Sequence, residues 1–290
     1  MGKGKRVRNK RICEIDMKEV KAERLYGVET SGFYFLKITA IVCMFLWYFS
    51  YAFYLPLEIP DRVFLMMQII GNISYPIFAF LVCESYFHTS NKLKHLLVMF
   101  AITIVSEIPY DYVMFEKPFE PKMQNPAGSL TFAFLALILT NINYKNGLKI
   151  FYKSAKMRAM VSFFLKIILV GLCGYMCIFL NLEFKWHGLF LVMIFAWVRK
   201  SRMRMLFQLI AVALFSWFNL KVSLINLADF IALIPIWIMQ WKRSCPTRFV
   251  KVDKLGFITA FASSKAVKYT ARYFYPVMFA GMAFALYLMK

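Results

Sequence analysis

Acidic side chains within apolar segments are the residues of this sequence best able to do chemistry. Glu107 and Asp111 are four residues apart, so they share one face of a predicted helix around the kink expected at Pro109. Intramembrane carboxylates are costly and mark functional positions by default. Asp229 and Arg62 are predicted at the same outer side. One interpretation is that these carboxylates bind a cationic amine or a peptide N-terminus. The alternative is that they hold helices together, with Glu107 or Asp111 paired to Arg62 or accepting hydrogen bonds from tyrosine hydroxyls.

A second set is predicted at the inner side of the membrane. Glu84, His88 and Lys92 follow one another at four-residue steps and therefore share a helix face. One interpretation is an interfacial ion pair where a helix ends. The alternative is contact with the phosphates of an acyl-CoA.

An imidazole is the usual general base of transfer chemistry at neutral pH. His187 and Glu183 are four residues apart at the outer start of a predicted span. If a general base lies on this side, His187 is the candidate; the alternative is an ordinary interfacial histidine. No metal site is predicted.

The elements that position these residues are membrane-spanning helices. The 290 residues are 61% hydrophobic and 18% aromatic, yet the net charge is +21, which is unsuited to a soluble domain. Crossing a bilayer takes about 20 apolar residues. The hydropathy pattern predicts an all-α polytopic membrane protein with nine spans near 34–56, 62–87, 95–115, 128–144, 158–180, 187–198, 205–219, 224–241 and 273–289.

The distribution of the 36 Lys and Arg residues predicts the orientation. Most lie in alternate connectors, which places the N-terminus inside and the C-terminus outside. The same asymmetry explains the charge without nucleic acid. Residues 1–30 are predicted to be a basic cytoplasmic tail, either solvated and partly disordered or drawn to anionic membrane lipid, and 34–56 a retained signal anchor. Residues 245–272 mix Phe with Lys and predict an interfacial helix, with a short tenth span as the alternative.

Two motifs carry a resemblance to a known family. The first is Pro76-Ile77-Phe78-Ala79-Phe80 followed by Glu84 and His88-Thr89, and the second is Ser106-Glu107-Ile108-Pro109-Tyr110-Asp111. With the apolar segment Gly188 to Arg199 and the run Phe274-Tyr275-Pro276, they resemble the TraX family. The resemblance covers residues 31–290. It implies a bacterial inner-membrane protein of acyltransferase type, whose family reaction moves an acetyl group from acetyl-CoA to a peptide N-terminus or an envelope polymer.

The chain departs from the family pattern at its proton-carrying positions. Family members have an Asp-His pair where this chain has Trp47-Tyr48, and a Tyr-Pro-x-His motif whose histidine is here Met278. The family's Asn before the fourth span matches either Asn125 or Ser129. Trp and Met cannot take a proton, and Tyr48 is a poor base at neutral pH although it can donate a hydrogen bond.

These replacements leave three function classes. The family reaction is degenerate here, or the chain is a catalytically inactive membrane scaffold that binds a peptide, an envelope polymer or a membrane protein partner. Rings around Trp47 and Tyr48 either pack in the outer aromatic belt or fill a former catalytic cavity. A transporter is the third class, and the absence of internal repeats and of inverted broken helices in the sequence argues against it.

Overall fold

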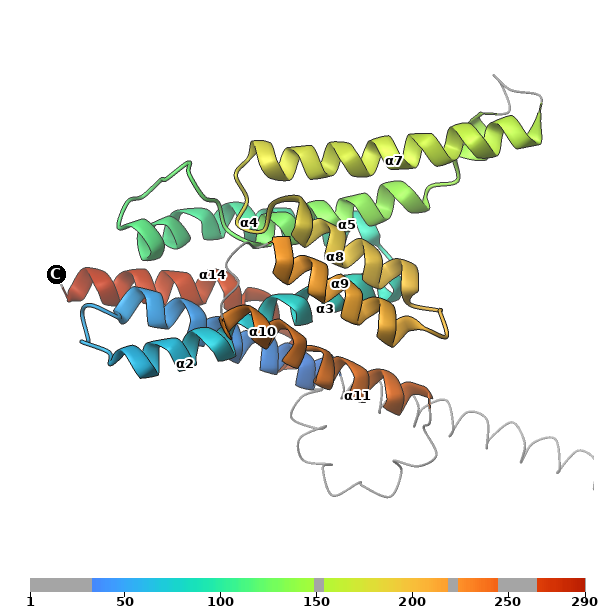
Figure 1. The fold of residues 1–290 in the computed structure, drawn as a ribbon. Helices are drawn as coiled ribbons and strands as arrows, with labels where there is room; N and C mark the ends of the chain where they lie inside the picture. The colour runs from blue at the N-terminus through green and yellow to red at the C-terminus, as the bar shows by residue number, and fades with distance from the viewer. Residues whose placement is uncertain (1–32, 149–153, 219–223, 245–264, 290) are drawn as a thin grey trace, which may run out of the picture.

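The computed structural model describes residues 33–148, 154–218, 224–244 and 265–289 (Figure 1). Within these ranges the chain is helical and has no strand; one isolated β-bridge joins Gln124 to Leu182. The predicted basic tail 1–30 and residues 245–264 of the predicted interfacial segment lie outside the described ranges.

The helices follow the predicted apolar segments. The first helix is Phe33–Phe53. The others are α2 Asp61–Asn72, α3 Ser74–His88, α4 Lys92–Phe115, α5 Ala127–Asn141, α6 Tyr144–Gly147, α7 Ala155–Phe179, α8 Lys185–Val198, α9 Arg204–Phe218, α10 Leu224–Ile231, α11 Leu233–Ser244 and α14 Lys265–Leu288.

Four helical stretches of the described chain are long and apolar enough to cross a bilayer: Phe33–Phe53, Asp61–His88, Lys92–Phe115 and Ala155–Phe179. Shorter apolar helices account for the other five predicted spans. The structure therefore confirms an all-helical membrane type of fold. It also extends the last helix, because residues 265–272, predicted as interfacial, are continuous with α14.

Two predicted spans are interrupted. The helix from Asp61 to His88 breaks at Ile73, between α2 and α3, and the one from Leu224 to Ser244 breaks at Ala232, between α10 and α11. Ile73 keeps right-handed helical angles (φ −58°, ψ −24°), so this break is a local loss of the hydrogen-bond ladder rather than an unwound segment.

α4 begins and ends on identifiable signals. The Asn91 side chain accepts a hydrogen bond from the Lys94 N–H at 2.9 Å and caps the start of the helix. The helix runs through Pro109 without ending there. It stops where Glu116 takes a left-handed conformation with φ 56°.

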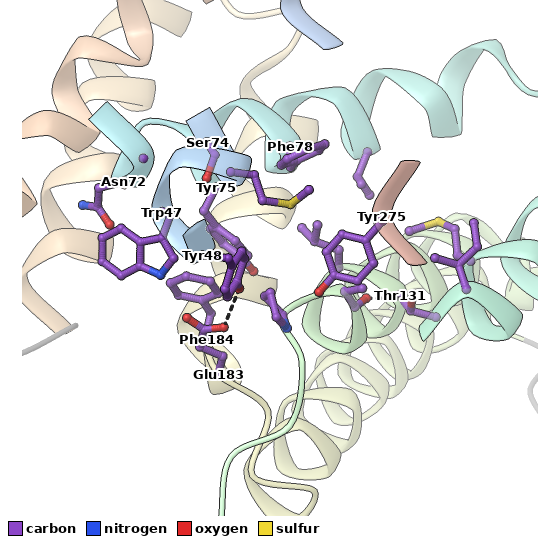
Figure 2. Close-up of a pocket in the computed structure, with 18 residues that line it drawn as sticks. Trp47, Tyr48, Asn72, Ser74, Tyr75, Phe78, Thr131, Glu183, Phe184 and Tyr275 are labelled. Atoms are coloured by element: carbon purple, nitrogen blue, oxygen red, sulfur yellow. Dashed lines mark hydrogen bonds between the residues drawn. The ribbon is translucent and has the colours of Figure 1, made fainter. Parts of the chain in front are cut away.

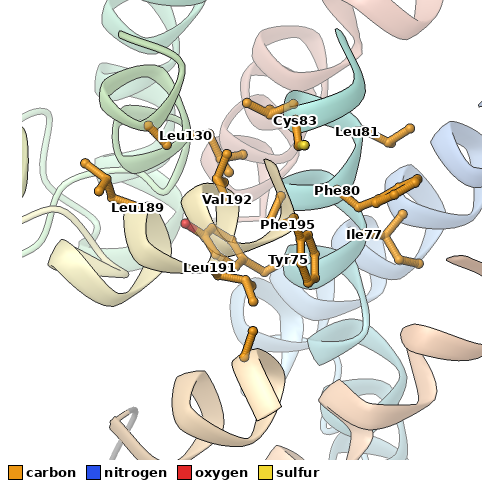
Figure 3. Close-up of a cluster of buried hydrophobic side chains, with 14 of the residues drawn as sticks. Tyr75, Ile77, Phe80, Leu81, Cys83, Leu130, Leu189, Leu191, Val192 and Phe195 are labelled. Carbon is orange, nitrogen blue, oxygen red and sulfur yellow. The ribbon is translucent and has the colours of Figure 1, made fainter. Parts of the chain in front are cut away.

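The helices run roughly along one direction and form a bundle with two opposite ends (Figure 1). The loop between α4 and α5 and the C-terminal end of α14 lie at one end, at the left of the picture; the connection between α8 and α9 lies at the other. A core of apolar side chains joins α3, α5 and α8, with Ile77, Phe134 and Leu191 almost completely buried (Figure 3).

A smaller cluster packs the first helix against α4 and α14, around Tyr110 and Phe279. α2 approaches the first helix closely because Gly71 has no side chain. A Cβ atom at this position would lie 2.6 Å from the Cβ of Trp47 and 2.9 Å from its backbone. Gly71 thereby fixes where Trp47 sits in the bundle.

α7 lies at one side of the bundle and presents large apolar residues outward (Figure 1). Phe163, Ile168 and Phe179 each expose more than 60% of their surface. A soluble monomer rarely exposes an apolar face of this extent, whereas a helix in contact with lipid requires one.

Candidate functional site

A cavity of about 200 Å³ lies inside the bundle, between the first helix, α3, α4, α5 and α14 (Figure 2). Its wall is mostly apolar and aromatic, and it contains one carboxylic acid, Glu183. The lining residues are Met44, Trp47, Tyr48, Gly71, Asn72, Ser74, Tyr75, Phe78, Val82, Met99, Ile102, Pro126, Ala127, Leu130, Thr131, Glu183, Phe184 and Tyr275.

Backbone pairing between two connecting segments fixes the position of Glu183. The N–H of Gln124 donates to the carbonyl of Asn181 at 3.0 Å, and the N–H of Glu183 donates to the carbonyl of Gln124 at 3.0 Å. Asn181 adopts φ 51°, which turns the chain sharply between α7 and α8. The acid is thus held by main-chain contacts on a segment that packs into the bundle.

Two tyrosine hydroxyls converge on Glu183. Tyr48 donates to Oε2 at 3.0 Å and Tyr110 donates to the same oxygen at 3.1 Å. Burial raises the pKa of Glu183 to about 7, and the two tyrosine hydrogen bonds oppose this increase. Burial therefore makes the protonated form of Glu183 more favourable than it is for an exposed glutamate.

Trp47 and Tyr48, which the resemblance sets against an Asp-His pair, both line the cavity, so the rings around them leave an open space beside them. The Tyr48 ring meets Tyr110 and Phe279 edge to face. Met278 is buried in the cluster around Phe279. Tyr48 thus keeps a polar contact within the cavity wall, whereas Met278 offers only packing.

Tyr275 lies across the cavity from the first helix (Figure 2). Its hydroxyl oxygen is buried beside the backbone N–H of Ala127, and no side-chain partner of this hydroxyl occurs within the described ranges. α5 begins at Ala127, another wall residue, so the positive end of a helix dipole also borders this space. Both features are suited to an oxygen acceptor on a bound molecule.

Glu107 and Asp111, predicted as catalytic candidates, hold the segment before α5 against α4. Glu107 accepts from the Asn125 backbone N–H at 3.3 Å and from its side-chain amide at 2.5 Å. Asp111 is fully buried and accepts from the Glu120 N–H at 2.8 Å. These are the partners in the structure rather than Arg62, which is exposed in the first turn of α2.

Asp229 lies at the interrupted helices. Its two carboxylate oxygens accept from the Asn72 amide at 2.8 Å and from the Ser216 hydroxyl at 2.7 Å. Asp229 is fully buried, and Asn72 separates it from the cavity, whose wall Asn72 joins. The predicted outer set is therefore divided. Glu107 and Asp111 bond to the segment before α5, Asp229 bonds to Asn72 and Ser216, and Glu183 takes part in neither group of contacts.

The predicted inner set forms an ion-pair cluster. Arg199, at the end of α8, donates to both oxygens of Glu84, at 2.9 and 3.0 Å, and His88 lies 3.3 Å from the same carboxylate. Lys92 lies over the Tyr86 ring. The sequence motif ends with Arg199 but gives no sign of this pairing.

A groove of about 570 Å³ lies next to this cluster, between α5 and α8. Its wall includes the cations Arg199 and Lys200, the polar residues Thr140 and Asn141, and apolar side chains such as Phe190. It is a second space in which an elongated ligand with an anionic end can fit.

His187, the predicted base candidate, is buried between rings. It meets Trp186 edge to face and Phe215 at a tilt. It is not one of the residues that line the cavity, although Glu183, four residues earlier, is. Of these two residues, Glu183 lines the cavity and His187 does not.

The arrangement defines a class: an α-helical membrane protein with a mostly apolar, partly open cavity and a polar cluster at its wall. The family model described as TraX protein matches residues 34–290. Because this match covers nearly all of the chain, the protein belongs to the TraX family. Neither a curated protein nor a solved structure matches the chain.

Proposed function

We propose that this protein is a multi-pass protein of the bacterial cytoplasmic membrane that transfers an acetyl group from acetyl-CoA to a peptide N-terminus or an envelope polymer. In the proposed topology the chain crosses the membrane nine times, with the N-terminus inside and the C-terminus outside. Glu183 then lies toward the outer side. Membership of the TraX family supports the reaction type, and the pattern of Lys and Arg supports the orientation.

The observation that carries the proposal is the composition of the cavity wall. An apolar space with one acid, and with the Tyr275 hydroxyl at a helix N-terminus, holds the minimum that acyl transfer needs: a proton acceptor and a donor for a developing oxyanion. A volume of about 200 Å³ suits an acetyl group with the reacting end of its acceptor.

The donor's phosphates would bind at the inner groove. Contact with these phosphates was one of the two interpretations of Glu84, His88 and Lys92. Because Arg199 neutralises Glu84, the cations bordering the groove are the better candidates. Lys200 is exposed at the groove wall, and Lys92 lies at the same end of the bundle. Phosphate groups favour such a cationic rim.

Acetyl-CoA is expected to stabilise the purified full-length protein against thermal unfolding. A ligand present at 100 times its dissociation constant adds about 2.7 kcal/mol to the stability of the state that binds it. The shift should shrink in Lys200→Ala and persist in Lys122→Ala, because Lys122 is exposed in the segment between α4 and α5. Differential scanning fluorimetry in detergent, with acetate and CoA as separate controls, measures it.

A binding subunit without catalysis is the second candidate, because positions 47, 48 and 278 carry no group that shuttles protons near neutral pH. A stoichiometric membrane or peptide partner that copurifies, together with no acetyl-CoA shift, would favour it. Ion-dependent uptake that requires Asp111 or Asp229 would instead favour a transporter.

A further inference from the structure

We propose that Glu183 is the general base of this protein, in the place of the family's histidine, and that Tyr48 is a positioning residue that orients it. The inference rests on the proposed acyl transfer. It replaces the expectation that His187 acts as the base, since Glu183 lines the cavity and His187 does not.

The geometry fixes Glu183 in one orientation. Its backbone N–H is bonded to Gln124, and both tyrosine hydroxyls donate to the same side-chain oxygen, Oε2. The Oε1 lone pairs are therefore the ones that can accept a proton from a molecule in the cavity. Glu183 thus makes three hydrogen bonds with three different segments, one through its backbone and two through its side chain, and is preorganised for the transfer.

The surroundings suit a base that works near neutral pH. Five tyrosines from the helices around Glu183 are the titratable groups near it: Tyr48 and Tyr51 from the first helix, Tyr75 from α3, Tyr110 from α4 and Tyr275 from α14. All five are neutral hydroxyls at pH 7, and no ion pair of Glu183 occurs in the described chain. With a pKa of about 7, Glu183 can take a proton and release it again.

The chemical step balances without another reactant. Glu183 takes a proton from the acceptor's amine or hydroxyl, while the acceptor's lone pair attacks the thioester carbon and forms the new C–N or C–O bond. The C–S bond then breaks, and the protonated Glu183 returns the proton to the leaving thiolate. The donor at the carbonyl oxygen is the Tyr275 hydroxyl, which lies at the N-terminus of α5 beside the Ala127 N–H.

Tyr48 is chemically able to position this base but not to replace it. Its hydrogen bond stabilises the charged carboxylate and lowers the Glu183 pKa. Removing the hydroxyl in Tyr48→Phe is therefore expected to raise that pKa. The acidic limb of the pH profile of turnover should then move to higher pH, a change that a structural role for Tyr48 would not produce.

The test follows incorporation of radiolabelled acetyl groups from acetyl-CoA in detergent-permeabilised membranes of cells that produce the full-length chain. Membranes without the chain give the background. Glu183→Gln keeps the size and hydrogen-bonding capacity of the side chain but removes the base, so we expect a loss of roughly 10²- to 10⁴-fold in rate. Glu58→Gln, at an exposed acid before α2, is the matched control and should keep the full rate.

Separate results overturn the two proposals. Membranes containing the unaltered chain that incorporate no label above background would refute acyl transfer itself. Incorporation by the unaltered chain that stays within a few-fold in Glu183→Gln would refute only the role of Glu183. The acetyl-CoA thermal shift, measured on the same variant, should be retained and excludes misfolding as the cause of a lost rate. Normal turnover by His187→Ala would remove the histidine alternative.

Discussion

Replacing Glu84 with alanine is expected to reduce the stability of the folded protein by about 3–5 kcal/mol, because the change leaves the partly buried Arg199 without its carboxylate. Glu84 is 2% exposed and Arg199 is 19% exposed, so water replaces little of the lost contact. Arg199 loses two hydrogen bonds, and His88 loses its contact at 3.3 Å. Equilibrium unfolding in mixed micelles with increasing SDS measures the effect.

The double variant Glu84→Ala with Arg199→Ala is the control for this prediction. It removes both charges, so its destabilisation should be smaller than the sum of the two single effects. Additive effects would mean that the two side chains do not interact in the folded protein. A loss below about 1 kcal/mol in Glu84→Ala would show a pair accessible to water, since that is the value typical of surface ion pairs.

Gly188→Ala is expected to destabilise the protein by about 1–3 kcal/mol and to displace Tyr75 from the cavity wall. A Cβ atom at position 188 would lie 2.0 Å from the Tyr75 hydroxyl oxygen, far inside contact distance. Tyr75 cannot easily yield, because its ring lies 3.7 Å from that of Phe184, centroid to centroid, and its hydroxyl is bonded to Ser129 at 2.8 Å.

Tyr75→Phe provides the internal check on this clash. Removing the hydroxyl makes room for the new methyl group, so Gly188→Ala should cost less in the Tyr75→Phe background than in the unaltered protein. Recovery will be partial, since the Tyr75 Cζ atom and the Phe184 Cβ atom would still lie 2.9 Å away. Equal costs in both backgrounds would contradict the close approach of α3 and α8. The same unfolding assay serves all four proteins.

The two carboxylates of α4, Glu107 and Asp111, contribute to the site by holding a neighbouring segment in place rather than by lining the cavity. Glu107 and Asp111 fix the segment 116–126 through Asn125 and Glu120. That segment carries Gln124, whose backbone holds Glu183 in place. The acids predicted to bind substrate thus support the cavity acid through one intervening segment.

The sequence alone predicted the helices well because the length of an apolar run is a local property. Each of the nine predicted segments is helical, and boundaries differ by a few residues except at α14, which begins eight residues earlier than predicted. The breaks at Ile73 and Ala232 were missed, although Pro76 and Pro235 lie three residues after them and lack the backbone N–H that would bond across each break. The family was also predicted from the sequence, through short motifs around Phe78 and Pro109.

The composition of the candidate site could be predicted only in part. Trp47, Tyr48 and Glu183 were identified as residues of interest by their chemistry or by the family pattern, and all three line one cavity. The pairing of Glu84 with Arg199 and of Asp229 with Asn72 was missed. These partners are 115 and 157 residues apart, and no local pattern specifies such contacts.

The sequence by itself determined the membrane-type helices and the family, because these depend on residue type and short spacing. Only the tertiary structure decided that Glu183 meets Tyr48, 135 residues away, and Tyr110, 73 residues away, in a shared cavity. The physical reason is that helix rotation and depth, set by close contacts such as Gly71 against Trp47 and Gly188 against Tyr75, decide which polar side chains meet.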